Sequence, residues 1–346
     1  MIYDNNSELF FNSSFIFHRS LYRNEPKYSS LYSTSRNIII GESTSFNPRE
    51  CIYSSIGEFV ERVGIIKGHS KISQNVKAFS LLSGEVREFN KDDIYLTGKK
   101  HNDSCGLASH INSCNAIENA LLEFIERQSF IDKCVFKRKG RQIDISNVDK
   151  KSSYLIKALY NHIDEVKLFE ISILPEAPVI LSMGTSKHLK CIGLACKLDI
   201  NDAIYASLEE SLQSFTNVKN KFNYKENVGS NLEEYMDLYS KHYSSLPVQD
   251  FKDYYSFLNS SRKADVDFYR NHLDINEIVK KIYEIYNVDI FCILIKNPLF
   301  LTNAKIVKVF SPNGYPHMYP KDNKMFKKSI YSNSNIEPDL NIIPFP

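Results

Sequence analysis

Apolar residues recur at helical spacing in several stretches of the chain, separated by polar segments. In the first stretch, 50–64, the apolar positions are Ile52, Ile56, Phe59, Val60 and Val63. Spacings of three and four residues place these side chains on one face of an amphipathic helix. The pattern is stronger in 114–132, and further helices are predicted at 151–162, 201–219 and 276–287.

Short apolar runs between these helices predict buried strands. The runs lie at 76–82, 92–97, 166–174, 177–184, 188–198, 288–297 and 304–312. Residues 101–113 are loop-like, and residues 1–46 show little periodicity. The alternation of helices and short strands predicts an α/β or α+β fold.

No low-complexity linker divides the chain. We therefore predict a single domain over 1–346, with room for a polar insertion at 220–272. A Pro-rich C-terminal tail is predicted at 336–346 and ends in Ile-Pro-Phe-Pro.

One acidic motif occurs twice. Residues 58–62 read Glu-Phe-Val-Glu-Arg, and residues 123–127, 65 positions later (123 − 58), read Glu-Phe-Ile-Glu-Arg. Glutamates three positions apart share one helix face, with the arginine beside the first of them. This self-similarity indicates duplicated supersecondary units. A third predicted helix carries Glu210 and Gln213 at a similar register.

Two such helices facing each other would gather four carboxylates around one space. Like charges share a space only when cations neutralise them. Carboxylate oxygens suit Mg²⁺, and Mg²⁺ suits nucleotide phosphates, so the repeated motif favours a magnesium-nucleotide site. The alternative is structural, because a Glu–Arg pair one turn apart is commonly a surface pair worth only about 0.3–0.5 kcal/mol.

Composition excludes several other classes of protein. A net charge of +2, from 43 basic and 41 acidic residues, gives no strong field for bulk nucleic-acid binding. No apolar run approaches the roughly 20 residues that span a bilayer, and the first residues do not resemble a signal peptide. The seven cysteines form no Cys-x-x-Cys pair, so free thiols in a cytoplasmic protein are expected.

Four segments, in order along the chain, resemble the YcaO family. They are SSIGEFVER (54–62), DSCGLASHINSCNAIENALLEFIERQSF (103–130), IGLACKLDINDAIYASLEESLQSF (192–215) and the Pro-Phe-Pro ending. The resemblance is closest to the azoline-forming branch, of the type of the D subunit of microcin B synthetases. Like that family, the chain has no Walker-type Gly-x-x-x-x-Gly-Lys-Ser/Thr loop.

The resemblance implies a YcaO-type fold with repeated strand-helix units around a nucleotide site, and ATP and Mg²⁺ as cofactors. It implies a cyclodehydratase that converts Cys, Ser or Thr of a ribosomal precursor peptide to thiazoline or oxazoline. In that reaction ATP phosphorylates the backbone amide oxygen. The family alternatives are another amide modification, such as thioamide or amidine formation, or a non-catalytic scaffold subunit.

The resemblance also assigns site residues. The expected nucleotide-binding set is Ser54, Glu58, Glu61, Asn115, Glu123, Glu126, Arg127, Glu210 and Gln213. The metal would be held by Glu58, Glu61, Glu123 and Glu126, with Arg127 on phosphate. Arg127 and Pro346 are the expected catalytic residues, the latter assisting proton transfer.

Three positions depart from the family pattern. Asn115 stands where many members carry a metal-binding acid, Ile111 where Asn is frequent, and Phe215 where many carry Arg. Glu118 is a candidate substitute for the missing acid, although a solvated side chain is the simpler interpretation. The departures allow for a weakened or partner-dependent ATPase.

The resemblance implies partner proteins as well. Only about 50 residues precede the first acidic helix, so a separate E1-like partner would bind the leader of the precursor peptide. A flavin-dependent oxidase in the same complex would convert azolines to azoles. No nucleic-acid or membrane partner is expected.

Overall fold

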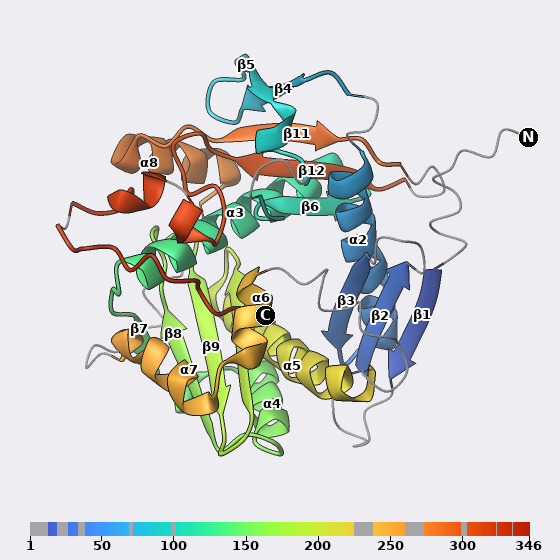
Figure 1. Cartoon of the computed structure of the whole chain (residues 1–346), viewed down its shortest axis with the longest axis vertical. Coiled ribbons are helices and arrows are strands. Elements are labelled where there is room, and N and C mark those ends of the chain that lie inside the picture. Colours follow the sequence, from blue (N-terminus) through green and yellow to red (C-terminus); the bar gives the residue numbers. More distant parts are fainter. Residues whose placement is uncertain are drawn as a thin grey trace, which may run out of the picture. The chain divides into compact units, whose positions relative to one another are not determined.

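The computed structural model describes residues 13–18, 27–33, 39–68, 72–97, 102–224, 238–259, 273–298, 303–322, 324–333 and 335–346. The chain forms two compact units. Unit 1 comprises Met1–Phe124 and Asp289–Pro312, and unit 2 comprises Ile125–Val288 and Asn313–Pro346. Figure 1 labels their helices and strands.

Unit 1 contains two antiparallel sheets. The first has the order β1-β2-β3, with β1 at Ser13–His18, β2 at Lys27–Ser33 and β3 at Ile40–Ser45. The second has the order β5-β4-β11-β12-β6. Its strands are β4 (Asn75–Ser80), β5 (Val86–Asn90), β6 (Leu107–His110), β11 (Phe291–Ile295) and β12 (Lys305–Phe310), and η1 (Lys91–Asp93) follows β5.

Helix α2 (Pro48–Lys67) supplies the core of unit 1. The Asn47 side chain accepts a hydrogen bond from the Arg49 N–H, and Pro48 occupies the first turn, where a missing N–H costs nothing. The buried face of α2 joins residues of β4, β11, β12 and β6 in one apolar cluster. Its largest members include Phe59, Phe291 and Tyr95.

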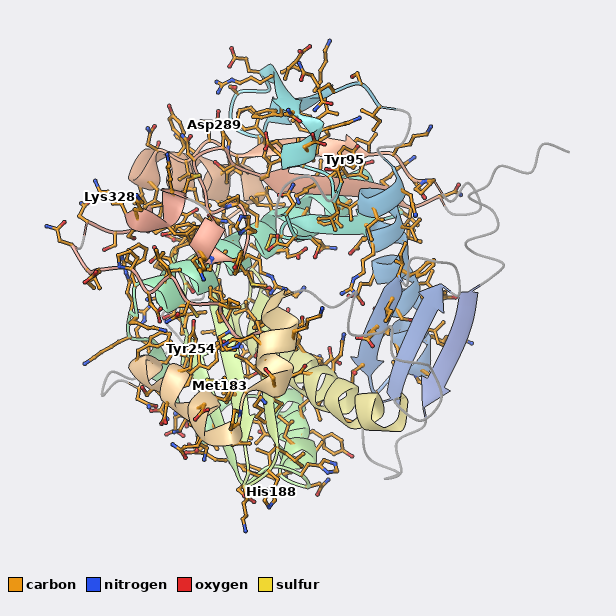
Figure 2. The ribbon with its side chains drawn as sticks, viewed as in Figure 1. Tyr95, Met183, His188, Tyr254, Asp289 and Lys328 are labelled. Carbon is orange, nitrogen blue, oxygen red and sulfur yellow. The ribbon has the colours of Figure 1, made fainter. Side chains whose placement is uncertain are left out.

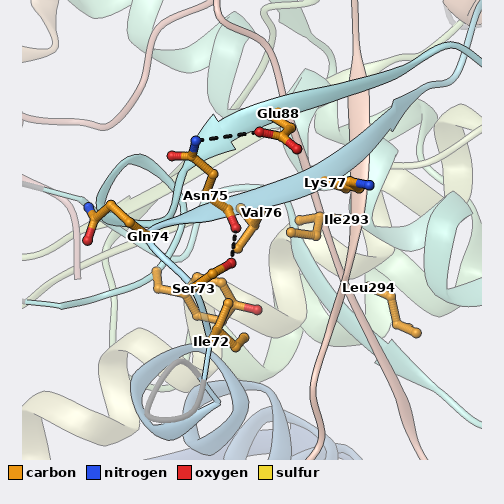
Figure 3. Close-up of a pocket in the computed structure, with 10 residues that line it drawn as sticks. Ile72, Ser73, Gln74, Asn75, Val76, Lys77, Glu88, Ile293 and Leu294 are labelled. Atoms are coloured by element: carbon orange, nitrogen blue, oxygen red, sulfur yellow. Dashed lines mark hydrogen bonds between the residues drawn. The ribbon is translucent and has the colours of Figure 1, made fainter.

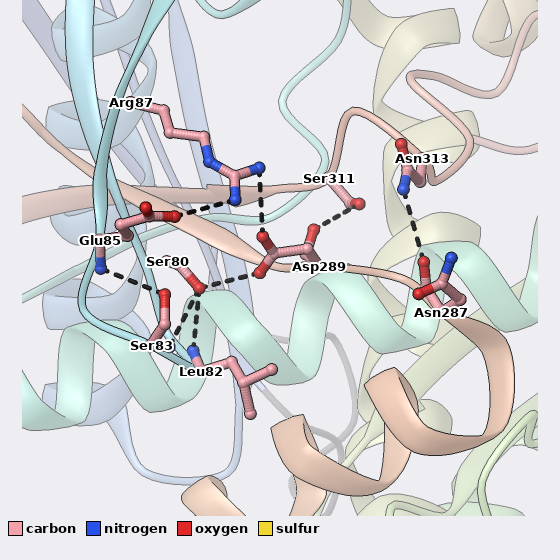
Figure 4. A network of polar contacts seen from close by, with 9 residues as sticks. All are labelled: Ser80, Leu82, Ser83, Glu85, Arg87, Asn287, Asp289, Ser311 and Asn313. Carbon is pink, nitrogen blue, oxygen red and sulfur yellow. Dashed lines mark hydrogen bonds and ion pairs between the residues drawn. The ribbon is translucent and has the colours of Figure 1, made fainter.

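One acid anchors the β4–β5 hairpin in unit 1 (Figure 4). The Ser80 hydroxyl donates to the Asp289 carboxylate at 2.8 Å, and Arg87 lies 3.5 Å from its other oxygen. Arg87 also lies over the Phe291 ring at 5.1 Å. The hairpin is therefore tied to the start of β11 through side chains as well as through the sheet.

Unit 2 is built on one antiparallel sheet of order β10-β9-β8-β7. Its strands are β7 (Arg141–Ile143), β8 (Glu165–Glu170), β9 (Val179–Thr185) and β10 (Lys190–Cys196). The helices are α4 (Lys150–Leu159), α5 (Ile200–Tyr224), α6 (Leu238–Ser245), α7 (Val248–Tyr254) and α8 (Ile275–Tyr286), with short turns η2 (Ile145–Asn147), η4 (Ser256–Leu258), η6 (Pro320–Asp322) and η7 (Lys324–Lys327). β9 is buried along its whole length, consistent with its central place in the sheet.

Helix α3 (Ser113–Val135) passes from unit 1 into unit 2 at Phe124. Its later half anchors the C-terminal part of unit 2. Gln128 donates to the Tyr315 carbonyl at 2.8 Å and accepts from the Tyr315 N–H at 2.7 Å, while Asp132 accepts from the hydroxyls of Tyr315 and Ser329. These hydrogen bonds pair the buried polar side chains of Gln128 and Asp132, as packing in an apolar interior requires.

The predicted helices are confirmed, with α3 and α5 longer than expected. One predicted strand was wrong, because residues 92–97 lie in η1 and a buried turn. Several strands were missed: β6 in the loop-like 101–113, β1, β2 and β3 in the first 46 residues, and β5 and β7 outside every predicted run. The polar insertion predicted at 220–272 lies partly outside the described residues, but Tyr243, Phe251 and Tyr255 within it are buried in unit 2.

The cysteines and the helix lengths bear on two expectations from composition. The seven cysteines are all free, and five of them are buried. Within the described part of the chain, the helices fall short of the length and apolar character needed to cross a bilayer. Side chains of both units are shown in Figure 2.

Candidate functional site

Three strand-helix units share one register. Each has a glycine seven residues before the helix begins, and a glutamate ten residues after it begins. The glycines are Gly41, Gly106 and Gly193, the first helical residues are Pro48, Ser113 and Ile200, and the glutamates are Glu58, Glu123 and Glu210. The second unit is displaced by 65 positions (106 − 41) and the third by 152 (193 − 41). The register is therefore shared by three copies, but the backbone arrangement is shared by the first and third alone: Gly41 and Gly193 lie inside their strands, whereas Gly106 precedes β6 in a turn with φ of +72°.

The glycines of the first and third copies let strand and helix approach closely. A Cβ on Gly41 would lie 2.2 Å from the Ser55 carbonyl oxygen, and a Cβ on Gly193 would lie 2.0 Å from the Ser207 carbonyl oxygen. Ser55 and Ser207 are matching helix positions. Each seryl hydroxyl donates at 2.9 Å to the carbonyl three residues earlier. No residue with a side chain fits at either glycine unless the helix moves.

The first glutamate of these two copies binds the edge of a sheet. β3 and β10 are edge strands, whose outward N–H groups need partners. The Glu58 carboxylate accepts the Glu42 N–H, and the Glu210 carboxylate accepts the Leu194 N–H at 2.6 Å. Donor and acceptor are separated by 16 residues in both copies.

The second glutamate of the motif in α2 and in α3 also accepts the N–H of an edge strand. Within unit 1, Glu61 accepts the Ser109 N–H of edge strand β6 at 2.6 Å. Within unit 2, Glu126 accepts the Cys196 N–H of β10 at 3.1 Å. Each of these carboxylates is therefore oriented by a backbone donor, which is the kind of support that metal-binding carboxylates have.

The two glutamates of α2 have unusual electrostatics. Burial raises the pKa of Glu58 above its usual value, although Arg62, 2.6 Å away, acts in the opposite direction. Burial and the charge of Glu58 together raise the pKa of Glu61 to about 8. Two half-buried acids that resist ionisation together would gain from a divalent cation, because its positive charge offsets both the cost of burial and the repulsion between the carboxylates.

In unit 2, Arg127 is held on several sides. Its Nε lies 3.3 Å from a Glu126 oxygen, and one terminal nitrogen donates to the Met318 sulfur at 3.7 Å. Its guanidinium group lies over the Phe345 ring at 4.9 Å. Only 15% of the arginine side chain is exposed, so its direction is fixed before any ligand arrives.

The C-terminal tail is part of the interior of unit 2. Ile343, Pro344 and Phe345 are buried, and the Tyr255 hydroxyl donates to the Pro344 carbonyl at 2.7 Å. The rings of Phe130 and Phe345 are 5.0 Å apart. Pro346 follows Phe345 and is half-buried.

The remaining predicted residues are more open. Ser54 is exposed on α2, one turn before Glu58, and Asn115 is exposed in the first turn of α3. Gln213 is half-buried on α5. Ile111, one of the departures from the family pattern, is 76% exposed. The side chain of Phe215 lies outside the described residues.

The structure brings Glu58 and Glu61 together in unit 1, and Glu126 and Arg127 together in unit 2. Among the residues that the structure describes, no group of three or more His, Cys, Asp or Glu side chains could hold a metal ion. The oriented carboxylates do suit Mg²⁺ in chemical type, since it prefers hard oxygen ligands. The predicted ligand set Glu58, Glu61, Glu123 and Glu126 stays a prediction.

A separate depression in unit 1 contains none of the predicted residues (Figure 3). It has a volume of about 650 Å³ and lies beside β4 and β11. Its lining is mixed and includes Val76, Tyr95 and Ile293 with Lys77 and Glu88. The acidic motif and this depression are therefore distinct features.

Two features of the structure were not predicted from the sequence. One is the set of edge-strand N–H groups that orient the glutamates, which depends on tertiary register. The other is Lys308, which is only 3% exposed in the middle of β12. A lone lysine inside the apolar run Ile306-Val307-Lys308-Val309 was the available signal.

Comparison with known proteins identifies the family. The model described as YcaO cyclodehydratase, ATP- and Mg²⁺-binding, matches residues 71–313, which is more than half of the chain. The predicted family, its α+β fold class and its cofactors ATP and Mg²⁺ are confirmed by these comparisons. A search of curated proteins finds no significant match.

Solved structures agree in fold. A chain of the E. coli microcin synthetase McbBCD complex with pro-MccB17 bound has a TM-score of 0.76 at 20% identity, over 96% of each chain. YcaO from Methanopyrus kandleri bound with AMPPCP and Mg²⁺ has a TM-score of 0.70 at 13% identity, over 86% of this chain and 84% of that one. A heterocyclase in complex with substrate and cofactor scores 0.68 at 12% identity, over 89% of this chain and 50% of that one. At these identities the likeness is one of fold.

Proposed function

Because the chain belongs to the YcaO family, we propose that it is the ATP-dependent cyclodehydratase subunit of a microcin-like azole synthetase. The observation that carries the proposal is the glutamate found at one register of three strand-helix units, at positions 58, 123 and 210. A glutamate that only formed a surface ion pair with arginine would have no reason to recur at the same position of three units. A family that binds ATP and Mg²⁺ needs several oriented acids.

The proposed roles follow the chemistry of each side chain. Glu58, Glu61, Glu123 and Glu126 would hold Mg²⁺, and Arg127 would bind phosphate oxygens, which its planar fork fits. Glu210, Gln213, Ser54 and Asn115 would support the nucleotide. When bound, Mg²⁺ supplies positive charge to the transferring phosphate.

Arg127 is prepared for this role. Its contacts with Glu126, Met318 and Phe345 restrict the guanidinium before ligand binding, so less conformational entropy is lost on binding phosphate. The Phe345 contact also gives the C-terminal tail a function, because the tail sets the direction of the arginine. Proton transfer assisted by Pro346 belongs to the same proposal.

The reaction has a clear energetic requirement. A Cys, Ser or Thr side chain of the precursor peptide adds to the preceding amide carbonyl, and the resulting oxyanion takes the terminal phosphoryl group of ATP. The O–H or S–H proton of that side chain is released on addition. Loss of phosphate, together with the amide N–H proton, then forms the C=N bond of the azoline, and ADP is the other product. The amide oxygen, a poor leaving group, departs as phosphate, and the enzyme must align the reactants and neutralise the developing charge.

Partner proteins are part of the proposal. The relative of TM-score 0.76 is a chain of a complex that holds a substrate peptide, pro-MccB17. By analogy, an E1-like partner would bind the leader of the precursor peptide, and a flavin-dependent oxidase would act on the azoline product. A cytoplasmic location fits such a complex.

The test is reconstitution of the chain with its precursor peptide and partner proteins. We expect ATP hydrolysis that the peptide stimulates, and a peptide mass that falls by about 18 Da for each ring formed. A rise of about 16 Da would instead identify exchange of oxygen for sulfur. Hydrolysis and peptide mass that stay unchanged in Glu123→Gln would leave the chain as a scaffold.

A further inference from the structure

The helix that carries Arg127 ends in a conformation that is rare for a lysine. Lys137, two residues after the end of α3, has a φ of 46°, in the left-handed region that favours glycine. The Arg138 N–H donates to the Lys133 carbonyl at 3.0 Å, which is the bond that closes a helix end of this type. Residues other than glycine are strained in this conformation, and such strain persists where the surroundings hold the residue in place.

The surroundings of the Lys137 side chain come from two other segments of unit 2. Its ammonium group lies 2.8 Å from a carboxylate oxygen of Asp339, in the C-terminal tail. It also lies 3.7 Å from the centre of the Tyr254 ring on α7 and 4.9 Å from that of Phe257 on η4. A cation beside a carboxylate and over aromatic faces is held in one direction. Lys137 therefore joins the end of α3 to the α7–η4 segment and to the tail.

Asp339 is the residue at which the tail is attached to the end of α3. Its N–H donates to the Val135 carbonyl at 2.6 Å. One oxygen of its carboxylate contacts Lys137, and the other accepts the Asn341 N–H at 3.0 Å, which turns the chain. Although burial acts in the opposite direction, these hydrogen bonds hold the pKa of Asp339 below its usual value. The tail is thus attached at one residue by both backbone and side chain.

From Asp339 the tail runs back along α3 to the arginine (Figure 1). Phe345, six residues later (345 − 339), has its ring centre 4.9 Å from the Arg127 guanidinium and 5.0 Å from that of Phe130. Arg127 precedes Lys137 by ten residues (137 − 127), which is a rise of about 15 Å along a helix. Six residues of extended chain reach at most about 20 Å. The tail has little slack between its two attachments, so the position of Asp339 limits where Phe345 can lie.

We infer that Lys137 is a positioning residue of the proposed cyclodehydratase, which fixes the place of the C-terminal tail along α3 by holding Asp339. It acts through the tail, which brings Phe345 against Arg127 and ends at Pro346. This inference rests on the proposed function, because the place of the tail matters to the reaction only if Arg127 and Pro346 take part in it.

The first test measures hydrogen exchange of the full chain by mass spectrometry, without any ligand. Lys137→Met should speed exchange of the amides in 339–345 by about 10-fold or more, because local opening of the tail becomes easier, while the buried strand β9 stays protected. Lys137→Arg, which keeps the cation, should exchange as the wild type does. The matched control is Lys139→Met, at an exposed lysine two residues later, which should also match the wild type. Tail exchange that Lys137→Met leaves unchanged would overturn the inference.

The second test measures ring formation in the complex reconstituted with partner proteins and precursor peptide. Lys137→Met should lower the rate about 10-fold, because a displaced tail no longer sets the direction of Arg127, and Lys137→Arg should restore it. If Lys137 acts through the tail, Lys137→Met combined with Phe345→Ala is no slower than Phe345→Ala alone. Losses that add, as independent sites give, would overturn the inference.

A glycine at position 137 separates the role in the tail from a role in the helix end. Glycine suits the left-handed backbone there, so Lys137→Gly keeps the end of α3 and tests the tail even if Lys137→Met does not fold. We expect Lys137→Gly to lose both the protection of the tail and the rate of ring formation. If it kept both, Lys137 would serve the helix end alone and the inference would be wrong.

The two proposals fail in different ways. A wild-type chain that forms no rings in the reconstituted complex overturns the proposed function, and the role of Lys137 in the reaction with it. Ring formation by the wild type that Lys137→Met leaves unchanged overturns the role of Lys137 alone.

Discussion

The β3–α2 and β10–α5 copies have the same backbone and different chemistry. Both have a strand glycine against a helix serine, and a glutamate that binds the edge strand. One turn further along the helix they diverge, with Glu61 and Arg62 in the first copy and Gln213 and Ser214 in the second. Charge is therefore concentrated in the first copy, where the pKa of both acids is raised.

The comparison separates two roles of one residue type. In both copies the first glutamate accepts an edge-strand N–H, and in the first copy it is also a proposed magnesium ligand. Of these two copies, only the first has a second acid, Glu61, and its pKa is raised by burial and by the charge of Glu58. The strand-helix packing that both copies share positions the first glutamate, and the second acid of the first copy indicates where a cation would be held.

Substitution at the close strand-helix contacts that the two copies share should have the largest effect on stability. We expect Gly41→Ala and Gly193→Ala to destabilise the chain by about 1–3 kcal/mol or more, because each new methyl group would overlap helix backbone. Denaturant unfolding would measure the loss. The matched control is Gly57→Ala on α2, where the nearest atom would lie 3.6 Å away, and it should be neutral or stabilising. Equal stability of all three variants would show that the close approach is not required.

The matched glutamates should differ in their effect on nucleotide binding. Glu58→Gln and Glu210→Gln both keep an oxygen for the strand N–H, so both should fold. We expect Glu58→Gln to weaken magnesium-dependent binding of an ATP analogue about 10–100-fold, and Glu210→Gln to weaken it less. Calorimetry on the two variants would measure the difference. A larger loss of affinity in Glu210→Gln than in Glu58→Gln would contradict the proposal that the cation is held at the first copy.

Glu61, the second acid of the first copy, should make the free energy of unfolding depend on pH. The pKa of Glu61 is raised from 4.5 to about 8, so the folded chain holds this proton more tightly than the unfolded chain. The contribution of Glu61 to stability is therefore full below about pH 4.5 and is lost as the pH rises through about 8. Glu61→Gln should lack this loss, so its stability relative to the wild type should increase over that range.

Chemical denaturation at a series of pH values, without Mg²⁺, would measure this effect. Gln213→Asn, at the matching position of the third copy, should keep the pH dependence of the wild type. A constant difference between Glu61→Gln and the wild type at all pH values would contradict the raised pKa.

The smallest effect is expected at Arg62. Its pair with Glu58 is close, at 2.6 Å, but 41% of the arginine side chain is exposed. A pair of this kind, one helical turn apart, contributes about 0.3–0.5 kcal/mol. Arg62→Gln should therefore change the free energy of unfolding by no more than that, and added salt should reduce the difference. A loss of several kcal/mol would mean that Arg62 is part of the core of the site.

Periodicity predicted the helices that carry the site. α2, α3 and α5 have long amphipathic patterns, and the repeated glutamates follow from their sequence alone. The strand β3, IGESTS, was missed because small polar residues fill it where it packs under a helix. Ile94 and Tyr95 gave the opposite error, since they are buried in a turn and an apolar run alone does not distinguish a turn from a strand.

The partners of the glutamates could not be predicted in the same way. The Ser109 N–H reaches Glu61 across 48 residues, and the Cys196 N–H reaches Glu126 across 70. Such contacts depend on sheet order and register, which the sequence pattern does not specify.

The central claim is that the repeated glutamates form a magnesium-nucleotide site. Calorimetry of the full chain with a non-hydrolysable ATP analogue, with and without Mg²⁺, tests it most directly, alongside Glu123→Gln. The account predicts binding that requires Mg²⁺ and is lost in Glu123→Gln. Binding that ignores Mg²⁺ and the substitution, or no binding even with partner protein and precursor peptide, would contradict it and make the repeats purely structural.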